Sequence, residues 1–130
     1  MPFGPPDAHD GPIKAMGLKE MAEYCDTLVK KLKYYVGCGY DMCSIHASYG
    51  ATLLSKFLSP KYNKRTDEFG GPMENRAKFP IMVAKAVKDA FGKDFLVEMQ
   101  VSGEEDDGLT IEDIVKFAKL AEGYIDILQL

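Results

Sequence analysis

The chain of 130 residues has no surplus of basic side chains, because 16 Lys and Arg stand against 20 Asp and Glu and the net charge is −4. Proteins that bind a nucleic-acid backbone do so with a basic face. The sequence also lacks any apolar run near the roughly 20 residues that a membrane-spanning helix requires. We therefore expect neither a nucleic-acid partner nor a membrane partner.

Secretory and disulfide features are missing as well. The first residues, MPFGPPDAHDGP, have no basic end followed by an apolar core, so they do not form a secretory signal. The three cysteines, Cys25, Cys38 and Cys43, are odd in number and follow no disulfide-framework spacing. Because disulfides belong to oxidising compartments, this pattern predicts a cytoplasmic protein.

No metal site is expected from the residues that could bind one. Cys43 and His46 stand three apart on a predicted strand, so their side chains point to opposite faces and cannot converge on one ion with Cys38. The acidic run from Glu104 to Asp107 does not have the spacing of a calcium loop. We interpret this run as a solvated loop.

The sequence does contain the periodic patterns of a globular domain, and hydrophobic residues make up an ordinary 46% of it. Apolar side chains recur at intervals of three and four from Leu18 to Val36, which predicts a helix with one buried face. We expect a second helix over Glu74 to Phe91, interrupted near Pro80, and a third that begins after the N-cap residue Thr110.

Strands are expected between these helices, over Tyr40–His46, Phe95–Ser102 and Tyr124–Leu130. In the first two, alternation gives one polar and one apolar face, and the polar face of the first ends in His46. Strands that alternate with helices predict an α/β fold with a parallel sheet and right-handed crossovers. Residues Pro2 to Pro12, rich in proline and glycine, are expected to form an irregular lead-in.

The stretch from Gly39 to Arg76 is where we expect a site. His46 and Tyr49 stand at the end of the first predicted strand, and ligand sites of parallel β/α folds lie in the loops that follow strands. An alternative for His46 is a structural hydrogen bond within the sheet. The loop NKRTDEFGG offers glycines and basic side chains to a phosphate, but we favour a structural role in which Arg65 pairs with Asp67.

Part of this stretch closely resembles the flavin-dependent oxidoreductases of the Old Yellow Enzyme family, also called NADH:flavin oxidoreductases. The resemblance is to the branch with enoate reductases, dienoyl-CoA reductases and trimethylamine dehydrogenase. That family shares a phrase of the form F-L-S-P-x-x-N-x-R-T-D-x-[YF]-G-G-x-x-E-N-R. The matching positions here are Phe57, Leu58, Ser59, Pro60, Asn63, Arg65, Thr66, Asp67, Phe69, Gly70, Gly71, Glu74, Asn75 and Arg76. Since a closed barrel takes about 250 residues, the resemblance implies that residues 1–130 are the central segment of a partial TIM (β/α)8 barrel.

The resemblance also implies roles for individual residues. Ile45 and His46 match an I-H pair whose histidine hydrogen-bonds an oxygen of the ligand over the flavin. The second donor position of the family holds Tyr49, and the family's tyrosine two positions later falls on Ala51. Gln100 stands where the family has an arginine beside the pyrimidine edge of the flavin, so this chain lacks that charge.

By resemblance, the expected function is that of an FMN-dependent NAD(P)H oxidoreductase of the ene-reductase type, which passes a hydride to an activated alkene and is reduced again by NADH or NADPH. His46 and Tyr49 would be catalytic, Gln100 would bind the cofactor, and any iron–sulfur cluster would lie outside this chain. The alternative is a non-catalytic barrel fragment that acts as a structural or assembly module.

The isolated chain is expected to behave differently from a complete barrel. Flavin sites of the family gather residues from strands at both ends of the barrel, so we expect the isolated chain to be inactive and not to bind FMN measurably. Its last predicted strand, Tyr124 to Leu130, offers an open edge and an apolar face. We therefore expect self-association through this strand, or association with the remaining barrel segments.

Overall fold

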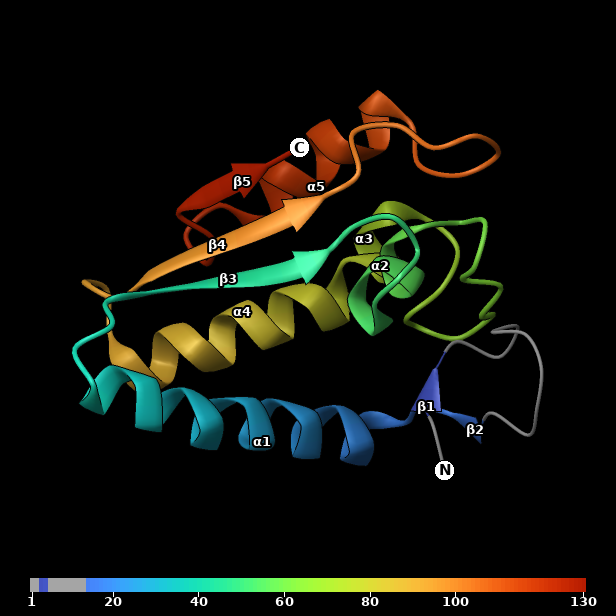
Figure 1. Ribbon diagram of the computed structural model, residues 1–130. Coiled ribbons are helices and arrows are strands. Elements are labelled where there is room, and N and C mark those ends of the chain that lie inside the picture. The colour runs from blue at the N-terminus through green and yellow to red at the C-terminus, as the bar shows by residue number, and fades with distance from the viewer. Residues whose placement is uncertain (1–2, 5–13) are drawn as a thin grey trace.

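The computed structural model describes residues 3–4 and 14–130, which form a parallel sheet and the helices that pack on one side of it (Figure 1). The sheet consists, in this order, of β3 (Met42–Ala47), β4 (Leu96–Val101) and β5 (Ile127–Gln129). The helices are α1 (Leu18–Gly37), α2 (Leu53–Leu58), α3 (Met73–Arg76), α4 (Lys78–Phe91) and α5 (Ile111–Ala121). The expected α/β fold of three parallel strands alternating with helices is confirmed.

The amino-terminal part contains a second, very small sheet. Strands β1 (Phe3–Gly4) and β2 (Lys14–Ala15) pair with each other in parallel and not with the main sheet. Apart from β1, the irregular lead-in expected for Pro2 to Pro12 lies outside the described residues. No helix within the described residues is long and apolar enough to cross a lipid bilayer.

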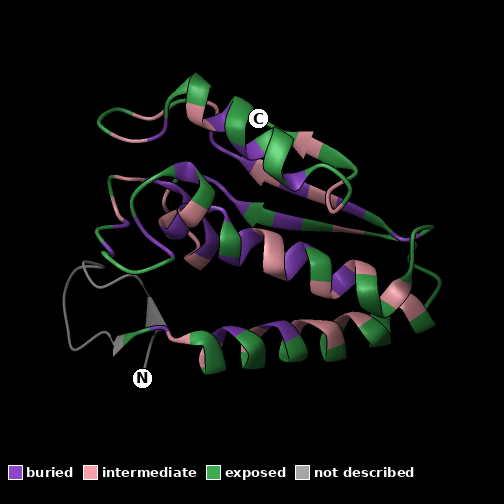
Figure 2. Ribbon diagram, turned by 180° about the vertical axis from the view of Figure 1, so that it is seen from behind, coloured by how far each residue is buried: buried purple, intermediate pink, exposed green. Residues whose placement is uncertain are grey.

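The main sheet has one buried and one open face, as the alternation in its strands predicts. On β4, Val97, Met99 and Val101 are buried, whereas Leu96 on the other face is 41% exposed. Figure 2 shows the side of the sheet that the helices cover. Fully buried phenylalanines from α4 and α5, Phe79 and Phe117, belong to the core on this side. The open face is therefore free to carry polar groups.

The connection after β3 contains a helix, α2, that the sequence analysis did not predict. Thr52 and Ser55 begin this helix with a reciprocal pair of hydrogen bonds: the Ser55 N–H donates to Thr52 Oγ1 at 3.3 Å, and the Thr52 N–H donates to Ser55 Oγ at 3.1 Å. Such a box satisfies backbone donors that the first turn leaves unpaired. Because this box starts α2 at Leu53, the exit from β3 is short.

The helix expected over Glu74 to Phe91 is divided into α3 and α4 at Ala77. Pro80 has no N–H and cannot bond to the carbonyl of Arg76, four residues earlier, so the hydrogen-bond ladder stops there. It resumes where the Ile81 N–H donates to the Ala77 carbonyl at 3.0 Å. The predicted interruption near Pro80 is confirmed.

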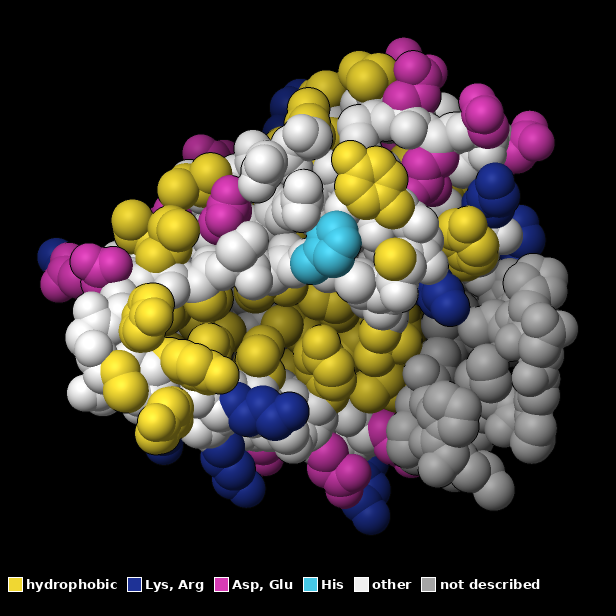
Figure 3. Space-filling model, viewed as in Figure 1, with side chains coloured by type: hydrophobic (Ala, Val, Ile, Leu, Met, Phe, Trp, Pro, Cys, Tyr) yellow, Lys and Arg dark blue, Asp and Glu magenta, His cyan; other side chains and the backbone are white. Residues whose placement is uncertain are grey.

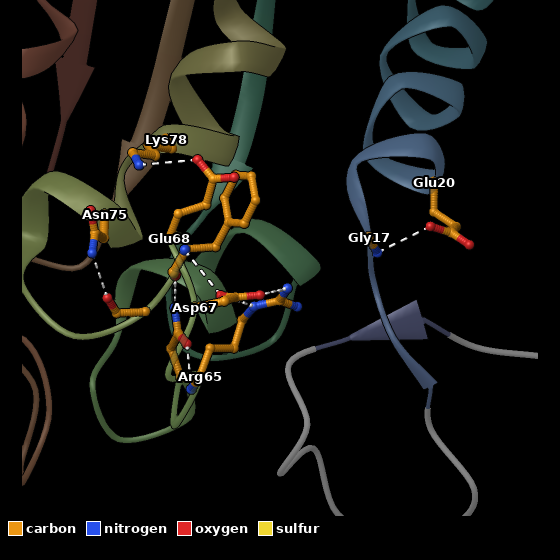
Figure 4. Close-up of polar contacts among 10 residues, drawn as sticks. Gly17, Glu20, Arg65, Asp67, Glu68, Asn75 and Lys78 are labelled. Atoms are coloured by element: carbon orange, nitrogen blue, oxygen red, sulfur yellow. Dashed lines mark hydrogen bonds and ion pairs between the residues drawn. The ribbon is translucent and has the colours of Figure 1, made fainter.

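The loop between α2 and α3 is held by its own side chains (Figure 4). The Asn63 amide donates to the carbonyls of Phe57 and Phe69 at 2.7 and 2.8 Å. Arg65 contacts both carboxylate oxygens of Asp67, from Nε at 2.9 Å and from Nη2 at 2.5 Å, and this bonding lowers the pKa of the Asp67 carboxyl. The predicted pairing of Arg65 with Asp67 is confirmed.

Arg76 connects this loop to α5. Its buried guanidinium donates to the carbonyls of Leu58 and Gly71, and its Nη2 atom lies 2.9 Å from Oδ1 of Asp113. The Asp113 N–H in turn donates to the Thr110 side chain at 3.2 Å, which confirms the predicted N-cap. The loops that follow β3 and β4 are thereby fixed to one another near the carboxyl ends of the strands.

Candidate functional site

His46, Gln100 and Gln129 form one row across the open face of the sheet. His46 is the register partner of Gln100, and Gln100 is the register partner of Gln129. Register partners in a parallel sheet carry their side chains on the same face. All three residues stand at the carboxyl ends of their strands, where β/α folds place their ligand sites.

His46 is exposed on this face and is supported by two hydroxyl groups. The Ser48 hydroxyl lies 3.0 Å from Nδ1 of the imidazole, and the Thr52 hydroxyl donates to the His46 carbonyl at 2.9 Å. Among the described residues, the ring has no other hydrogen-bond partner. Nε2 therefore makes no hydrogen bond within the described residues. Figure 3 shows the histidine in cyan, on the surface beside a hollowed apolar area.

Tyr49 follows the strand in a left-handed backbone conformation with φ of 60°, which is uncommon for a bulky residue. Its N–H donates to the buried Ser102 hydroxyl at 2.8 Å, which ties the exit of β3 to the end of β4. The Tyr49 side chain is 74% exposed, and its ring centroid lies 6.4 Å from that of His46. Backbone strain of this kind clusters at ligand sites, and here it positions a phenol beside the imidazole.

The row itself contains no Lys or Arg, since it consists of one imidazole and two amides. Cys43 lies on the opposite face of β3, where burial raises its pKa to about 11, so it remains a thiol. Within the described part of the chain, no cluster of three or more His, Cys, Asp and Glu could hold a metal ion. The site can therefore supply hydrogen bonds and a weak acid.

The structure brings together His46, Tyr49 and Gln100, which the sequence analysis singled out, and adds residues that it missed. Gln129 was missed because its place in the row depends on the pairing of β5 with β4. Ser48 and Ser102 were missed because small polar residues at strand ends carry no pattern of their own. The available signal was their place at the ends of the predicted strands, Ser102 as the last residue of one and Ser48 two residues after the other.

Curated proteins similar to this chain are named as NADPH dehydrogenases and an NADH oxidase. An NADPH dehydrogenase of Bacillus cytotoxicus is 38% identical over 91 residues, which are 69% of this chain and 26% of that protein. An NADH oxidase of Thermoanaerobacter brockii is 29% identical over 111 residues, which are 84% of this chain and 17% of that protein. The chain thus spans between 17% and 26% of the length of these relatives.

Solved structures share the fold over almost the whole chain. Histamine dehydrogenase from a Rhizobium species superposes with a TM-score of 0.85 and 25% identity, over 98% of this chain and 20% of that one. A 2-naphthoyl-CoA reductase in complex with 2-naphthoyl-CoA has a TM-score of 0.78 and 26% identity, over 99% of this chain and 21% of that one. Old Yellow Enzyme from a Pichia species, at a TM-score of 0.75 and 24% identity over 92% of this chain and 36% of that one, shares the fold.

The match to a whole family is equally extensive. The family model described as the NADH:flavin oxidoreductase / NADH oxidase family matches residues 7–129. The three parallel strands and their helices accordingly form part of a (β/α)8 barrel. The chain belongs to the NADH:flavin oxidoreductase / NADH oxidase family.

Proposed function

We propose that residues 1–130 supply the central part of the active site of an FMN-dependent NAD(P)H oxidoreductase that reduces an activated alkene. The observation that carries this proposal is the row of His46, Gln100 and Gln129 at the carboxyl ends of three parallel strands. The family to which the chain belongs, and the names of its relatives, support a flavin and a nicotinamide nucleotide as the cofactors.

The side chains of the row fit a flavin in the chemistry of their donors and acceptors. The pyrimidine edge of the ring system alternates carbonyl oxygens with an N–H, and a glutamine amide offers both a donor and an acceptor. Gln100, which the family resemblance places at that edge, and its register partner Gln129 could pair with it. FMN, when bound, would accept a hydride from NADH or NADPH and deliver it to the substrate.

In this proposal His46 and Tyr49 act on the substrate. His46 donates a hydrogen bond from Nε2 to the carbonyl oxygen of the substrate and so stabilises the negative charge that develops there, an effect for which loss of one donor costs about a hundredfold or more. Tyr49 supplies a proton to the α-carbon as a neutral acid. Its exposed phenol beside the imidazole supports this role.

The test uses the complete reading frame that contains this chain, purified in the presence of FMN. We expect visible flavin absorbance and oxidation of NADH or NADPH that increases when an enone is added. His46→Ala should lower enone reduction about a hundredfold and leave flavin absorbance in place. Absence of both flavin absorbance and NAD(P)H oxidation from the folded protein would show that the proposal is wrong.

A non-catalytic role for these residues is the second candidate, and the uncharged Gln100 favours it. We further propose that the isolated chain does not bind FMN measurably. Isothermal titration of the isolated chain with FMN tests this second proposal, because micromolar or tighter binding would contradict it. A complete protein that binds no FMN but keeps a cooperative fold supports the structural role.

A further inference from the structure

The hydrogen bond of Ser48 determines which ring nitrogen of His46 carries the hydrogen, in addition to where the ring lies. Ser48 is fully buried, with 0% of its surface exposed, and it lies between β3 and α2. Its hydroxyl oxygen is 3.0 Å from Nδ1 of His46. Among the described residues, the imidazole is the partner of this hydroxyl, and no backbone carbonyl competes for its hydrogen.

A count of hydrogens assigns the direction of this bond. A serine hydroxyl carries one hydrogen, and leaving that hydrogen buried without an acceptor is destabilising. If Nδ1 donated to Ser48, the hydrogen of the serine would have no acceptor among the described residues. If Ser48 donates to Nδ1 instead, every hydrogen at this contact is used.

We infer that Ser48 is a positioning residue that donates to Nδ1 and holds His46 as the neutral tautomer with its hydrogen on Nε2. The Thr52 hydroxyl, 2.9 Å from the His46 carbonyl, fixes the backbone of the same residue. The ring therefore offers a directed N–H on the side away from Ser48, toward the open face. This inference rests on the proposed function and deepens it, because an N–H at that place pairs with an acceptor atom such as the carbonyl oxygen of the substrate.

A matched role for Ser102 follows from the second contact at the strand ends. Ser102 accepts from the Tyr49 N–H at 2.8 Å and is 5% exposed. It holds the backbone of Tyr49, while Ser48 holds the ring of His46. A change at Ser102 should therefore move the phenol and leave the state of the imidazole unchanged, which makes Ser102→Ala the control.

The experiment is nitrogen-15 NMR of the imidazoles in the 130-residue chain at mildly alkaline pH, where an ordinary imidazole is neutral. The sequence has two histidines, His9 and His46, so His9→Gln leaves a single imidazole to observe. We expect the coupling pattern of an imidazole that carries its hydrogen on Nε2. We also expect the Nδ1 resonance to be shielded relative to that of an unprotonated ring nitrogen without a hydrogen bond. Ser48→Ala should shift the Nδ1 resonance toward that of free imidazole, Ser48→Thr should restore it, and Ser102→Ala should leave it in place.

If the chain with Ser48 in place shows the Nδ1–H tautomer, the inference is wrong. This result needs no variant at Ser48, so the test remains valid even if Ser48→Ala does not fold. An Nδ1 resonance that is the same with and without the serine hydroxyl also overturns it. The outcome is independent of the flavin. If the complete protein binds no FMN while His46 shows the expected tautomer, the proposed function fails and the role of Ser48 stands.

Discussion

Gln100 lies directly across from His46 in the parallel register of β3 and β4, so an uncharged amide stands beside the imidazole at the carboxyl ends of both strands. The family resemblance predicts an arginine at this position, next to the part of the flavin that gains negative charge on reduction. An amide there can form hydrogen bonds but cannot neutralise charge. The affinity of the site for FMN should therefore be limited by this one residue.

Replacing Gln100 with Arg in the complete protein should tighten FMN binding about tenfold, because a hydrogen bond to a charged group contributes about 1.5 to 3 kcal/mol and a neutral one about 0.5 to 1.5. Quenching of FMN fluorescence measures the change. Ser44→Arg is the control, since it adds the same charge to the same face of the sheet, on the neighbouring strand β3 and further from the carboxyl ends. Equal affinity for Gln100→Arg and the unchanged protein would contradict the assignment of Gln100 to the cofactor.

The ion pair between Arg76 and Asp113 should be important for stability. Only 5% of the Arg76 side chain and 20% of the Asp113 side chain are exposed, and their atoms approach to 2.9 Å. Arg76→Met should lower the free energy of unfolding by about 3 to 5 kcal/mol, because it leaves a carboxylate unpaired and two carbonyls without their donor. Urea unfolding measures this loss.

The matched control for that variant is Lys85→Met. Lys85 pairs with Asp89 at 2.5 Å, but both side chains are more than half exposed. Solvent screens an exposed pair on one helix, so Lys85→Met should lower the free energy of unfolding far less than Arg76→Met does. Equal losses for the two variants would mean that burial of Arg76 does not determine the strength of its contacts.

Most helices and strands could be predicted from the periodicity of apolar residues in the sequence, whereas the candidate site depends on which strands pair in the sheet. The apolar stripe of α1 and the alternation in β4 are local patterns, and both elements formed within a residue or two of the predicted bounds. The last strand is shorter than predicted, Ile127–Gln129, because the N–H groups of Tyr124 and Ile125 donate to the Ala121 carbonyl in the turn that follows α5. The row that contains Gln129 could not be predicted, since it requires knowledge of which strands are neighbours.

Asp126 should make stability depend on pH. Lys88, 2.5 Å away, and the Val97 N–H lower the pKa of the Asp126 carboxyl below its ordinary value of 3.8. A carboxyl whose pKa is lowered by folding contributes stability at pH values above its pKa in the unfolded chain. This contribution is lost as the pH falls through its pKa in the folded chain. The stability difference between the unchanged chain and Asp126→Asn should therefore be full near neutral pH and shrink below 3.8.

Urea unfolding at about pH 7 and in a series of acid buffers measures this difference. Asp94→Asn, at an exposed turn position before β4, is the control and should change stability by no more than about 0.5 kcal/mol. A difference between the unchanged chain and Asp126→Asn that grows on acidification would have the wrong sign for a lowered pKa. It would exclude the Lys88 contact as its cause.

The edge formed by β5 should make the isolated chain self-associate. Within the described sheet β5 is an edge strand, and Ile127 and Leu130 are 41% and 67% exposed. Unpaired edges beside apolar side chains are sites of strand pairing between molecules. Full burial of one such side chain contributes about 1.5 to 3 kcal/mol, a large share of the about 5 to 15 kcal/mol that stabilises a domain, so association should compete with the monomer.

Sedimentation at about 100 μM, in the range where exposed apolar edges aggregate, should show species larger than a monomer. Ile127→Lys should shift the chain toward the monomer, because a lysine on an edge strand opposes pairing. Ile111→Lys is the matched control, since Ile111 is 51% exposed at the start of α5 and not on the edge strand. A clean monomer with a cooperative melt, or equal effects of the two lysines, would mean that β5 is not the contact.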